Sequence, residues 1–237
     1  MIMKCVALLS GGVDSATACV LAKRDGYEVH GLNFRRLRKE FETDYACRFA
    51  ERLHIPIKVV DADVTSLIRD MQETSLRYVT EGGYQWEFLW GRNIIYLVLA
   101  ANFAASINAS TIVVGFAPHD APSTEVPSSC DYPDCHPLVL DKLSNLLTLT
   151  LHRTTQPCPK GGTVQIIAPL VGRAKTKVDV FKLALGLGIN IEDTISCYTP
   201  IKTSDGWRSC GQCLACQHRR AALTILREQG FNVPSTS

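Results

Sequence analysis

The sequence predicts an α/β protein built on a doubly wound, five-stranded parallel sheet and followed by a small, cysteine-rich helical module. Three observations lead to this prediction. Short apolar runs alternate with helical patterns from the first residues onward, as in folds with a parallel sheet. The first apolar run leads directly into "SGGVDS", a glycine-rich turn between strand and helix. From Ile191 onward the composition changes to cysteine, glycine and basic residues.

The first part of the chain alternates strand and helix twice. "KCVALL" is an apolar run that ends at Ser-Gly-Gly, which is typical of a buried parallel strand leading into a loop. Residues 15–23 then predict a helix, "YEVHGLNF" a second strand, and residues 40–53 a second helix with apolar side chains at helical spacing. "PIKVVDAD" predicts the third strand. We therefore expect parallel strands joined by right-handed crossovers.

The middle of the chain is less regular. Residues 64–90 carry a weak pattern that Gly82 and Gly83 interrupt. Residues 94–107 predict a helix that is apolar nearly all round and therefore buried, and "STIVVGF" predicts the fourth strand. Residues 117–137 are rich in Pro, Ser and Asp, so we expect a long loop there. A loop of this length in a compact domain is usually functional or mobile.

The remaining elements complete the sheet and begin the module. Residues 141–151 predict a helix, "VQIIAPL" the fifth strand, and residues 175–187 another helix. The cysteine-rich part ends in a helix expected over residues 217–229. We therefore divide the chain into a domain of residues 1–190 and a module of residues 191–237 packed on it.

The composition excludes several classes of protein. The chain has 237 residues, of which 46% are hydrophobic and 20% charged, so an ordered globular protein is expected. Its net charge of +2 gives no surface-wide argument for nucleic-acid binding. The apolar runs are shorter than the roughly 20 residues of a membrane span, and the N-terminus lacks a signal-peptide cleavage site. We therefore expect a soluble, cytoplasmic protein with no membrane partner.

The "SGGVDS" stretch has the features of a phosphate-binding loop. Gly11 and Gly12 allow the backbone to approach an anion at the start of a helix, and Ser10 and Ser15 add hydroxyl donors. The stretch matches neither G-x-x-x-x-G-K-[ST] nor G-x-G-x-x-G, and a plain strand-to-helix turn would also use glycine and aspartate. Asp14 favours the functional interpretation, because a carboxylate beside an anion site requires a cation such as Mg²⁺ between them.

Four of the ten cysteines lie close together in the sequence. Cys210, Cys213 and Cys216 form C-x₂-C-x₂-C, and Cys197 precedes them in "SCY". Four thiolates, two of them from a C-x₂-C pair, match a closed tetrahedral zinc site. A redox pair or unrelated reduced thiols are the alternatives. We expect a structural zinc ion at these cysteines rather than catalytic sulfur chemistry.

Several motifs together carry a resemblance to a known family. "SGGVDS" directly after the first strand resembles the pyrophosphatase loop of the N-type ATP pyrophosphatases. With "WGRN", "YPDCHP" and "SCY" in this order, nearly the whole chain resembles the QueC family of 7-cyano-7-deazaguanine synthases. The resemblance implies an adenine nucleotide alpha hydrolase-like fold. It also implies that ATP and Mg²⁺ activate 7-carboxy-7-deazaguanine, that ammonia then forms an amide, and that a second activation yields the nitrile. A homodimer is expected.

The resemblance also implies roles for individual residues. Catalysis is assigned to Asp14, Lys175 and Arg92. ATP binding is assigned to Ser10, Gly11, Gly12, Asp14, Ser15, Gly115 and Lys175. Binding of the deazaguanine is assigned to Arg92, Asn93, Asp120, Tyr132 and Asp134. Plainer interpretations are that Arg92 is an ion-pair partner, Asp134 a turn residue and Lys175 a solvated helix charge. Cys135 is the thiol near this site that could form a covalent intermediate.

The chain departs from the family pattern mainly on the substrate side. "FRR" at Phe34 to Arg36 replaces the usual "YGQ", His136 replaces an arginine, "FLW" replaces a Val-Pro before "GRN", and the loop over residues 117–130 is longer. These changes leave open whether the amine is ammonia or another, such as a protein amino group. A tRNA-modifying enzyme of the same superfamily and a catalytically inactive nucleotide-binding subunit are further alternatives.

Overall fold

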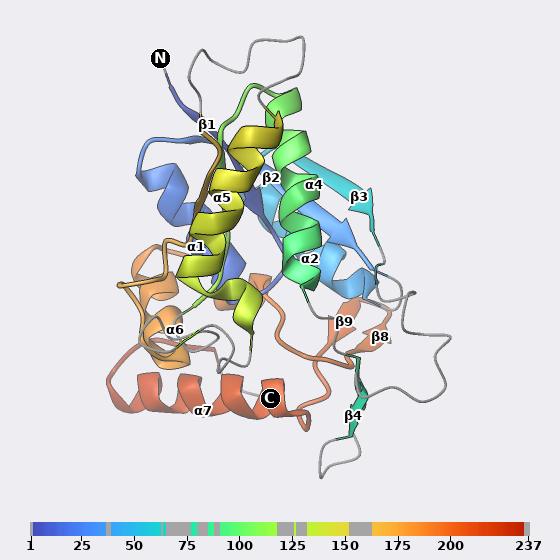
Figure 1. Ribbon diagram of the computed structural model, residues 1–237. Coiled ribbons are helices and arrows are strands. Elements are labelled where there is room, and N and C mark those ends of the chain that lie inside the picture. The colour runs from blue at the N-terminus through green and yellow to red at the C-terminus, as the bar shows by residue number, and fades with distance from the viewer. Residues whose placement is uncertain are drawn as a thin grey trace.

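A five-stranded parallel sheet forms the centre of the protein, as Figure 1 shows for the computed structural model. The structure describes residues 2–36, 39–62, 64, 77–79, 85–87, 91–117, 126, 132–151 and 163–234. The strands are β1 (Lys4–Leu8), β2 (Glu28–Arg35), β3 (Ile57–Asp61), β6 (Thr111–Val113) and β7 (Gln165–Ile167). Their order across the sheet is β3-β2-β1-β6-β7, with parallel pairing throughout. Each of the five strands predicted from the sequence is confirmed.

The predicted helices are present, with shifted ends. They are α1 (Val13–Arg24), α2 (Glu40–Arg52), α4 (Arg92–Ser106), α5 (Pro137–Leu151), α6 (Lys177–Gly186) and α7 (Leu214–Glu228), with short 3₁₀ turns η2 (Pro133–Cys135) and η3 (Ile191–Asp193). The expected start of α5 at residue 141 is wrong by one turn. The backbone N–H of Leu138 donates to Nδ1 of His136 over 3.1 Å, and proline is favourable in the first helical position, so the "HP" dipeptide begins this helix.

Two antiparallel hairpins lie outside the main sheet. They are β4 (Arg77–Val79) with β5 (Gln85–Glu87), and β8 (Ile201–Thr203) with β9 (Gly206–Arg208). The first falls in the stretch where the sequence pattern was weak. The second lies between two of the clustered cysteines, where no strand was predicted because three-residue strands carry too short a pattern.

Helices cover both faces of the sheet, which confirms the doubly wound arrangement. Along β1 and just beyond it, Cys5, Ala7 and Leu9 face a core that includes buried side chains of α1, α2 and α6. Val6 faces a second core built with α4 and α5, because successive side chains of a strand point to opposite faces. Figure 1 shows α4 and α5 side by side over one face.

The order of the strands creates a crevice at one end of the sheet. From β1 the chain moves through β2 to β3 on one side, and it then returns to place β6 and β7 on the other side. Loops that leave β1 and β6 therefore diverge at their carboxyl ends. Ligands of open α/β sheets bind at such a switch point.

The C-terminal module packs against the domain near this end of the sheet. Ala222, Leu223 and Leu226 of α7 belong to the same buried cluster as side chains of α1 and α6, and Figure 1 shows α7 running across the end of the molecule below the strands. Among the described residues, no helix is long and apolar enough to cross a membrane. The division of the chain into a domain and a module at residue 190 stays a prediction.

Candidate nucleotide site and metal centre

The glycine loop follows β1 and is shaped by close backbone packing. Gly11 has φ +79°, and a Cβ on it would lie 2.5 Å from the carbonyl oxygen of Glu42. Such a contact excludes every residue with a side chain. Gly12 forms the N-cap of α1, and its carbonyl accepts hydrogen bonds from the Ser15 hydroxyl at 3.0 Å and the Ala16 N–H at 3.1 Å. Gly11 therefore brings the loop against α2, and Gly12 begins α1.

The two serines of the loop have different roles. Ser15 is buried, and its hydroxyl oxygen accepts from the Ser10 N–H at 3.2 Å and lies 3.1 Å from the Ser10 hydroxyl. Ser15 thus stabilises the loop from within. Ser10 is exposed, so its hydroxyl is the one placed to meet a ligand.

Gly115 lies just beyond β6 and touches the loop directly. A Cβ on Gly115 would lie 2.5 Å from the backbone nitrogen of Ser15 and 2.7 Å from the carbonyl carbon of Asp14. The two strand ends at the switch point are therefore in backbone contact. The prediction that Gly115 belongs to the ATP site stays a prediction, but the structure places it at the loop.

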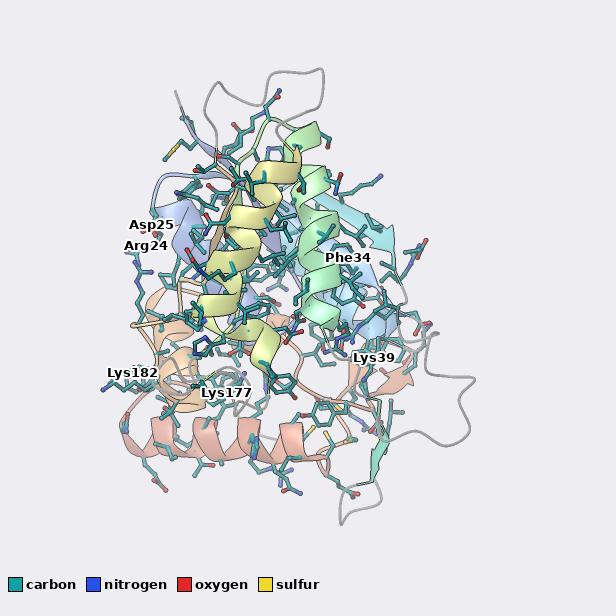
Figure 2. The ribbon with its side chains drawn as sticks, viewed as in Figure 1. Arg24, Asp25, Phe34, Lys39, Lys177 and Lys182 are labelled. Carbon is teal, nitrogen blue, oxygen red and sulfur yellow. The ribbon has the colours of Figure 1, made fainter. Side chains whose placement is uncertain are left out.

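A cleft of about 250 Å³ opens beside the loop at the carboxyl ends of β1, β2 and β6. One wall is apolar and includes Phe34 and Tyr96, whose rings stack at 4.7 Å; Figure 2 shows Phe34 beside α4. Polar side chains complete the lining: Ser10, Asp14, Ser15, Asn33, Arg36, Glu42, Arg92 and Asn93. An apolar wall with a few polar groups is the usual composition of a small-molecule site.

Lys177 brings a positive charge to the glycine loop. Its Nζ donates a hydrogen bond to Oδ2 of Asp14, and Figure 2 shows Lys177 at the end of the molecule where α6 meets α7. Lys175, to which this role was assigned from the sequence, is exposed, and its backbone N–H donates to the Asp179 carboxylate at 3.0 Å. The structure therefore brings Lys177, and not Lys175, to Asp14.

A capping box explains why Lys177 points inward. The Thr176 side chain accepts from the Asp179 N–H at 3.2 Å, and the Asp179 carboxylate accepts from the Thr176 N–H at 2.9 Å. These reciprocal bonds make Thr176 the N-cap, so Lys177 becomes the first residue of α6 and Lys175 stays outside it. The "TKVD" sequence is the signal that could have identified Lys177.

Asp14 has one oxygen suited to a metal ion. Oδ2 accepts from Lys177, whereas Oδ1 is buried and receives no hydrogen bond from any residue in the described parts of the chain. A buried carboxylate oxygen without a donor is unfavourable, and hard cations such as Mg²⁺ are bound by such oxygens. The residues present therefore fit the expected Mg²⁺ contact at Asp14.

Asn93 and Asp134, both expected to bind substrate, are bonded to each other. The backbone N–H of Asn93 donates to Oδ2 of Asp134 at 2.9 Å, and its side-chain nitrogen donates to Oδ1 at 3.1 Å. The same nitrogen lies 3.3 Å from the sulfur of Cys135. Because the N-cap of α4 is Gly91, which has no side chain, Asp134 supplies the acceptor that the start of this helix needs. Both residues thus shape the cleft wall.

The other expected substrate residues are only partly placed. Arg92 lines the cleft from the first turn of α4. Tyr132 precedes η2 and is half-buried. Asp120, and most of the loop over residues 117–130, lies outside the described residues. Cys135 is buried and is not one of the described residues that line the cleft.

The sequence did not identify two further pairs of hydrogen-bonded side chains at the cleft. Asn33 is buried at the end of β2, where it donates to the Leu9 carbonyl at 2.6 Å and accepts from the Thr43 hydroxyl at 2.7 Å. Arg36 donates to the Glu42 carboxylate. The first pair joins β1 to α2, and the second places opposite charges on the wall. No short motif marks either pair, since the partners come from different elements.

Substituting Asp134 by Asn is expected to destabilise the protein. Both Asp134 oxygens accept hydrogen bonds from Asn93, and an amide NH₂ in place of one oxygen would face an Asn93 donor. The lost buried hydrogen bond is expected to lower the free energy of unfolding by about 1–3 kcal/mol. Urea denaturation measures the effect. Asp141→Asn is the control, because Asp141 is exposed on α5 and, within the described residues, its carboxylate accepts one long hydrogen bond, from Asn145 at 3.4 Å. Equal stability of the two variants would contradict the capping role of Asp134.

The four clustered cysteines converge in space. The sulfur atoms of Cys197, Cys210, Cys213 and Cys216 all lie within 4.8 Å of one another. They come from the segment before β8, the turn after β9 and the first turn of α7. Four thiolates in this arrangement fit the tetrahedral zinc site predicted from the spacing.

Local hydrogen bonds favour the thiolate form of one of these cysteines, which is the form that binds a metal. Burial alone would raise the pKa of the Cys210 thiol, but N–H groups of Cys213 and Gln212 donate to it, and its pKa falls to about 6. Burial raises the pKa of Cys197 above its usual value. Burial also lowers the pKa values of Lys39 and Arg219, two cationic side chains beside the cluster.

The segment before the cluster touches the glycine loop. The N–H of Ile195 donates to the carbonyl of Gly11 at 2.8 Å, and Ile195, Cys197, Cys216 and Phe41 form one buried cluster. Trp207 of β9 packs edge-on against Phe41 at 5.6 Å and donates to Asp44 at 2.8 Å. The C-terminal module therefore packs against the glycine loop and α2 from outside the sheet.

Fold and site together define the class of protein. A glycine loop at the switch point of a parallel sheet, a lysine from a later helix and an adjoining apolar cleft are the features of an α/β protein that binds a nucleotide by its phosphates. Residues 4–227 match the family model described as "Queuosine biosynthesis protein QueC". The chain belongs to the QueC family.

Individual relatives support the same assignment. The 7-cyano-7-deazaguanine synthase of Synechococcus sp. (strain RCC307) is 34% identical over 232 residues, which cover 95% of each chain. That of Pseudoalteromonas atlantica is 29% identical over 232 residues, 94% of each chain. The predicted tRNA methyltransferase subunit of Methanocaldococcus jannaschii shares the fold, with a TM-score of 0.52, 18% identity, and coverage of 99% of this chain and 91% of that one. The predicted family resemblance and fold class are confirmed.

Proposed function

We propose that the protein uses ATP to activate 7-carboxy-7-deazaguanine, forms an amide from it with ammonia, and dehydrates the amide to 7-cyano-7-deazaguanine. Membership of the QueC family and the printed names of its relatives support this function. The single structural observation that carries the proposal is the contact of Lys177 with Asp14 at the glycine loop. It supports the proposal because a cation and a carboxylate at a glycine loop can bind phosphates and their metal ion.

The first step of the proposed reaction transfers the adenylyl group. A carboxylate oxygen of the substrate attacks the α-phosphorus of ATP, the bond to the bridging oxygen breaks, and pyrophosphate leaves with the electron pair. Backbone N–H groups at the start of α1 and the ammonium of Lys177 stabilise the charge that develops on pyrophosphate. Mg²⁺ bound at Oδ1 of Asp14 would supply further neutralisation of phosphate charge. Catalysis by these groups is electrostatic and positional.

The remaining steps use the same site. Ammonia attacks the acyl carbon, AMP leaves, and the amide forms with release of a proton. In the second activation the amide oxygen attacks the α-phosphorus of another ATP and pyrophosphate leaves; the nitrogen loses its two protons, the C–O bond breaks, AMP leaves and the nitrile forms. Arg92, whose guanidinium suits a carboxylate, binds the acid in this proposal. Asn93 and Asp134 hold the wall of the cleft beside it.

The function is tested with the four components of the reaction. We expect AMP, pyrophosphate and a product with the mass of the nitrile when the protein is given ATP, Mg²⁺, ammonia and 7-carboxy-7-deazaguanine. Reactions without the acid or without ammonia are the controls, and the second of these should stop before the amide. AMP formation that does not depend on the acid would contradict the proposal.

Further properties belong to the same proposal. We propose zinc as the ion at the four cysteines, a homodimer as the assembly and the cytoplasm as the location. Leu146 and Leu149 of α5 are 56% and 75% exposed, and a contact between two copies would bury such side chains. Metal analysis and the mass of the native protein in solution test the first two properties.

A further inference from the structure

Two cationic side chains beside the four cysteines have no acidic partner among the residues that the structure describes. Lys39, the N-cap residue of α2, donates to the carbonyl of Tyr198 at 2.8 Å, and its Nζ lies 5.2 Å from the centre of the Phe41 ring. In the described part of the chain, the hydrogen-bond acceptors of Arg219 of α7 are neutral oxygens: Thr194 Oγ1 at 3.1 Å, Ser196 Oγ at 3.4 Å and the Ile191 carbonyl at 2.6 Å.

Two nearby acidic residues are paired with other arginines. Glu42 is paired with Arg36, and Asp193 is paired with Arg52. Within the described ranges, neither cation forms a salt bridge with a carboxylate within 4 Å, and both side chains are half-buried. A partly desolvated charge without a counter-charge is unfavourable, so a negative group near each of these residues would stabilise them.

The position of both cations points to the cysteine cluster. Lys39 binds the residue after Cys197, and Arg219 binds the residue before it. Arg219 also follows Cys216 by three positions on α7, which places the two side chains on the same face of the helix. Lys39 and Arg219 therefore approach the four sulfurs from two different elements.

The charges balance when a divalent metal is bound. Four thiolates carry four negative charges and a divalent ion carries two positive charges, so the filled centre has two excess negative charges. Lys39 and Arg219 together supply two positive charges. We infer that Lys39 and Arg219 are the counter-charges of a dianionic four-thiolate metal centre. Outer residues of this kind orient and tune metal ligands.

A purely structural role for the two residues gives different expectations. If Arg219 acts only through its hydrogen bonds, Arg219→Lys should weaken zinc binding as much as Arg219→Met does. One ammonium group cannot replace the planar guanidinium on three acceptors. If its charge matters, the lysine variant retains the metal. The comparison between Arg219→Lys and Arg219→Met therefore separates charge from bracing.

Metal affinity of the full-length protein provides the test. Zn²⁺ is competed between the protein and a chromogenic chelator, and bound zinc is counted by mass spectrometry. We expect Lys39→Met and Arg219→Met to weaken zinc binding by roughly 10- to 100-fold each. Arg219→Lys should lie within about threefold of the unmodified protein, because it keeps the charge.

Two exposed residues, Lys23 on α1 and Arg227 on α7, serve as controls. Lys23 donates to the Leu53 carbonyl at 2.7 Å, and Arg227 of α7 donates to the Pro234 carbonyl at 2.9 Å, so each imitates the hydrogen bonding of its counterpart away from the sulfurs. Lys23→Met and Arg227→Met should leave zinc affinity unchanged. Unchanged affinity in both test variants, or equal loss in Arg219→Lys and Arg219→Met, would overturn the inference. If Arg219→Met does not fold, the affinity of Lys39→Met alone decides.

Discussion

Replacing Lys177 by Met is expected to lower kcat/KM for pyrophosphate release by roughly 100- to 1,000-fold, the usual effect of removing one preorganised group that stabilises transition-state charge. The ammonium of Lys177 lies against Asp14 at the glycine loop, where the departing pyrophosphate is proposed to accumulate charge. Initial rates of pyrophosphate release at several ATP concentrations measure the effect. A fall in kcat, rather than only a rise in KM, is expected because the charge develops in the transition state.

Lys175→Met provides the matched control. It removes the same side chain two residues earlier, from an exposed position where the backbone N–H, and not the ammonium, donates a hydrogen bond to Asp179. We expect kcat/KM within about threefold of the unmodified protein, because exposed charges are screened by solvent and salt. If Lys175→Met were the impaired variant and Lys177→Met were active, the original assignment from the sequence would be correct and the one from the structure wrong.

The two lysines show where interpretation of the sequence loses accuracy. Apolar periodicity located the helix over residues 175–187, but periodicity defines a helix start only to within a few residues. A shift of two residues on a helix turns a side chain by about half a circle. The Thr176 capping box decides which lysine faces inward. The capping box consists of local hydrogen bonds between particular residues, which hydropathy does not reveal.

Contacts between distant segments explain most of what the sequence could not predict. The five strands, the glycine loop and the four cysteines were predictable because each is a local pattern or a fixed spacing. Asn93 and Asp134 are both predicted substrate residues, and that role stays a prediction; their bond to each other depends on η2 meeting the start of α4. Lys39 and Arg219 are 180 residues apart in the chain, so only the fold reveals that they approach the same sulfurs.

Replacing Gly115 by Ala is expected to destabilise the protein by about 3 kcal/mol and to weaken ATP binding at least tenfold. The added methyl group would lie 2.5 Å from the backbone nitrogen of Ser15. Overpacking of this kind is usually relieved by movement of the backbone at a cost of a few kcal/mol. Here the neighbour is the start of α1, so relief of the clash displaces the N–H groups that are proposed to hold phosphate. Urea denaturation and ATP titration measure the two effects.

Gly186→Ala separates this steric effect from the general consequences of replacing glycine. Gly186 ends α6, and an added Cβ there meets nothing within 4 Å. Alanine at such a position is expected to stabilise the protein by about 0.4–1 kcal/mol, because it restricts the unfolded chain. ATP affinity should not change. Stability and affinity of Gly115→Ala equal to those of the unmodified protein would mean that β6 and the loop can separate freely, and the close backbone contact would then have no role in holding the phosphate site.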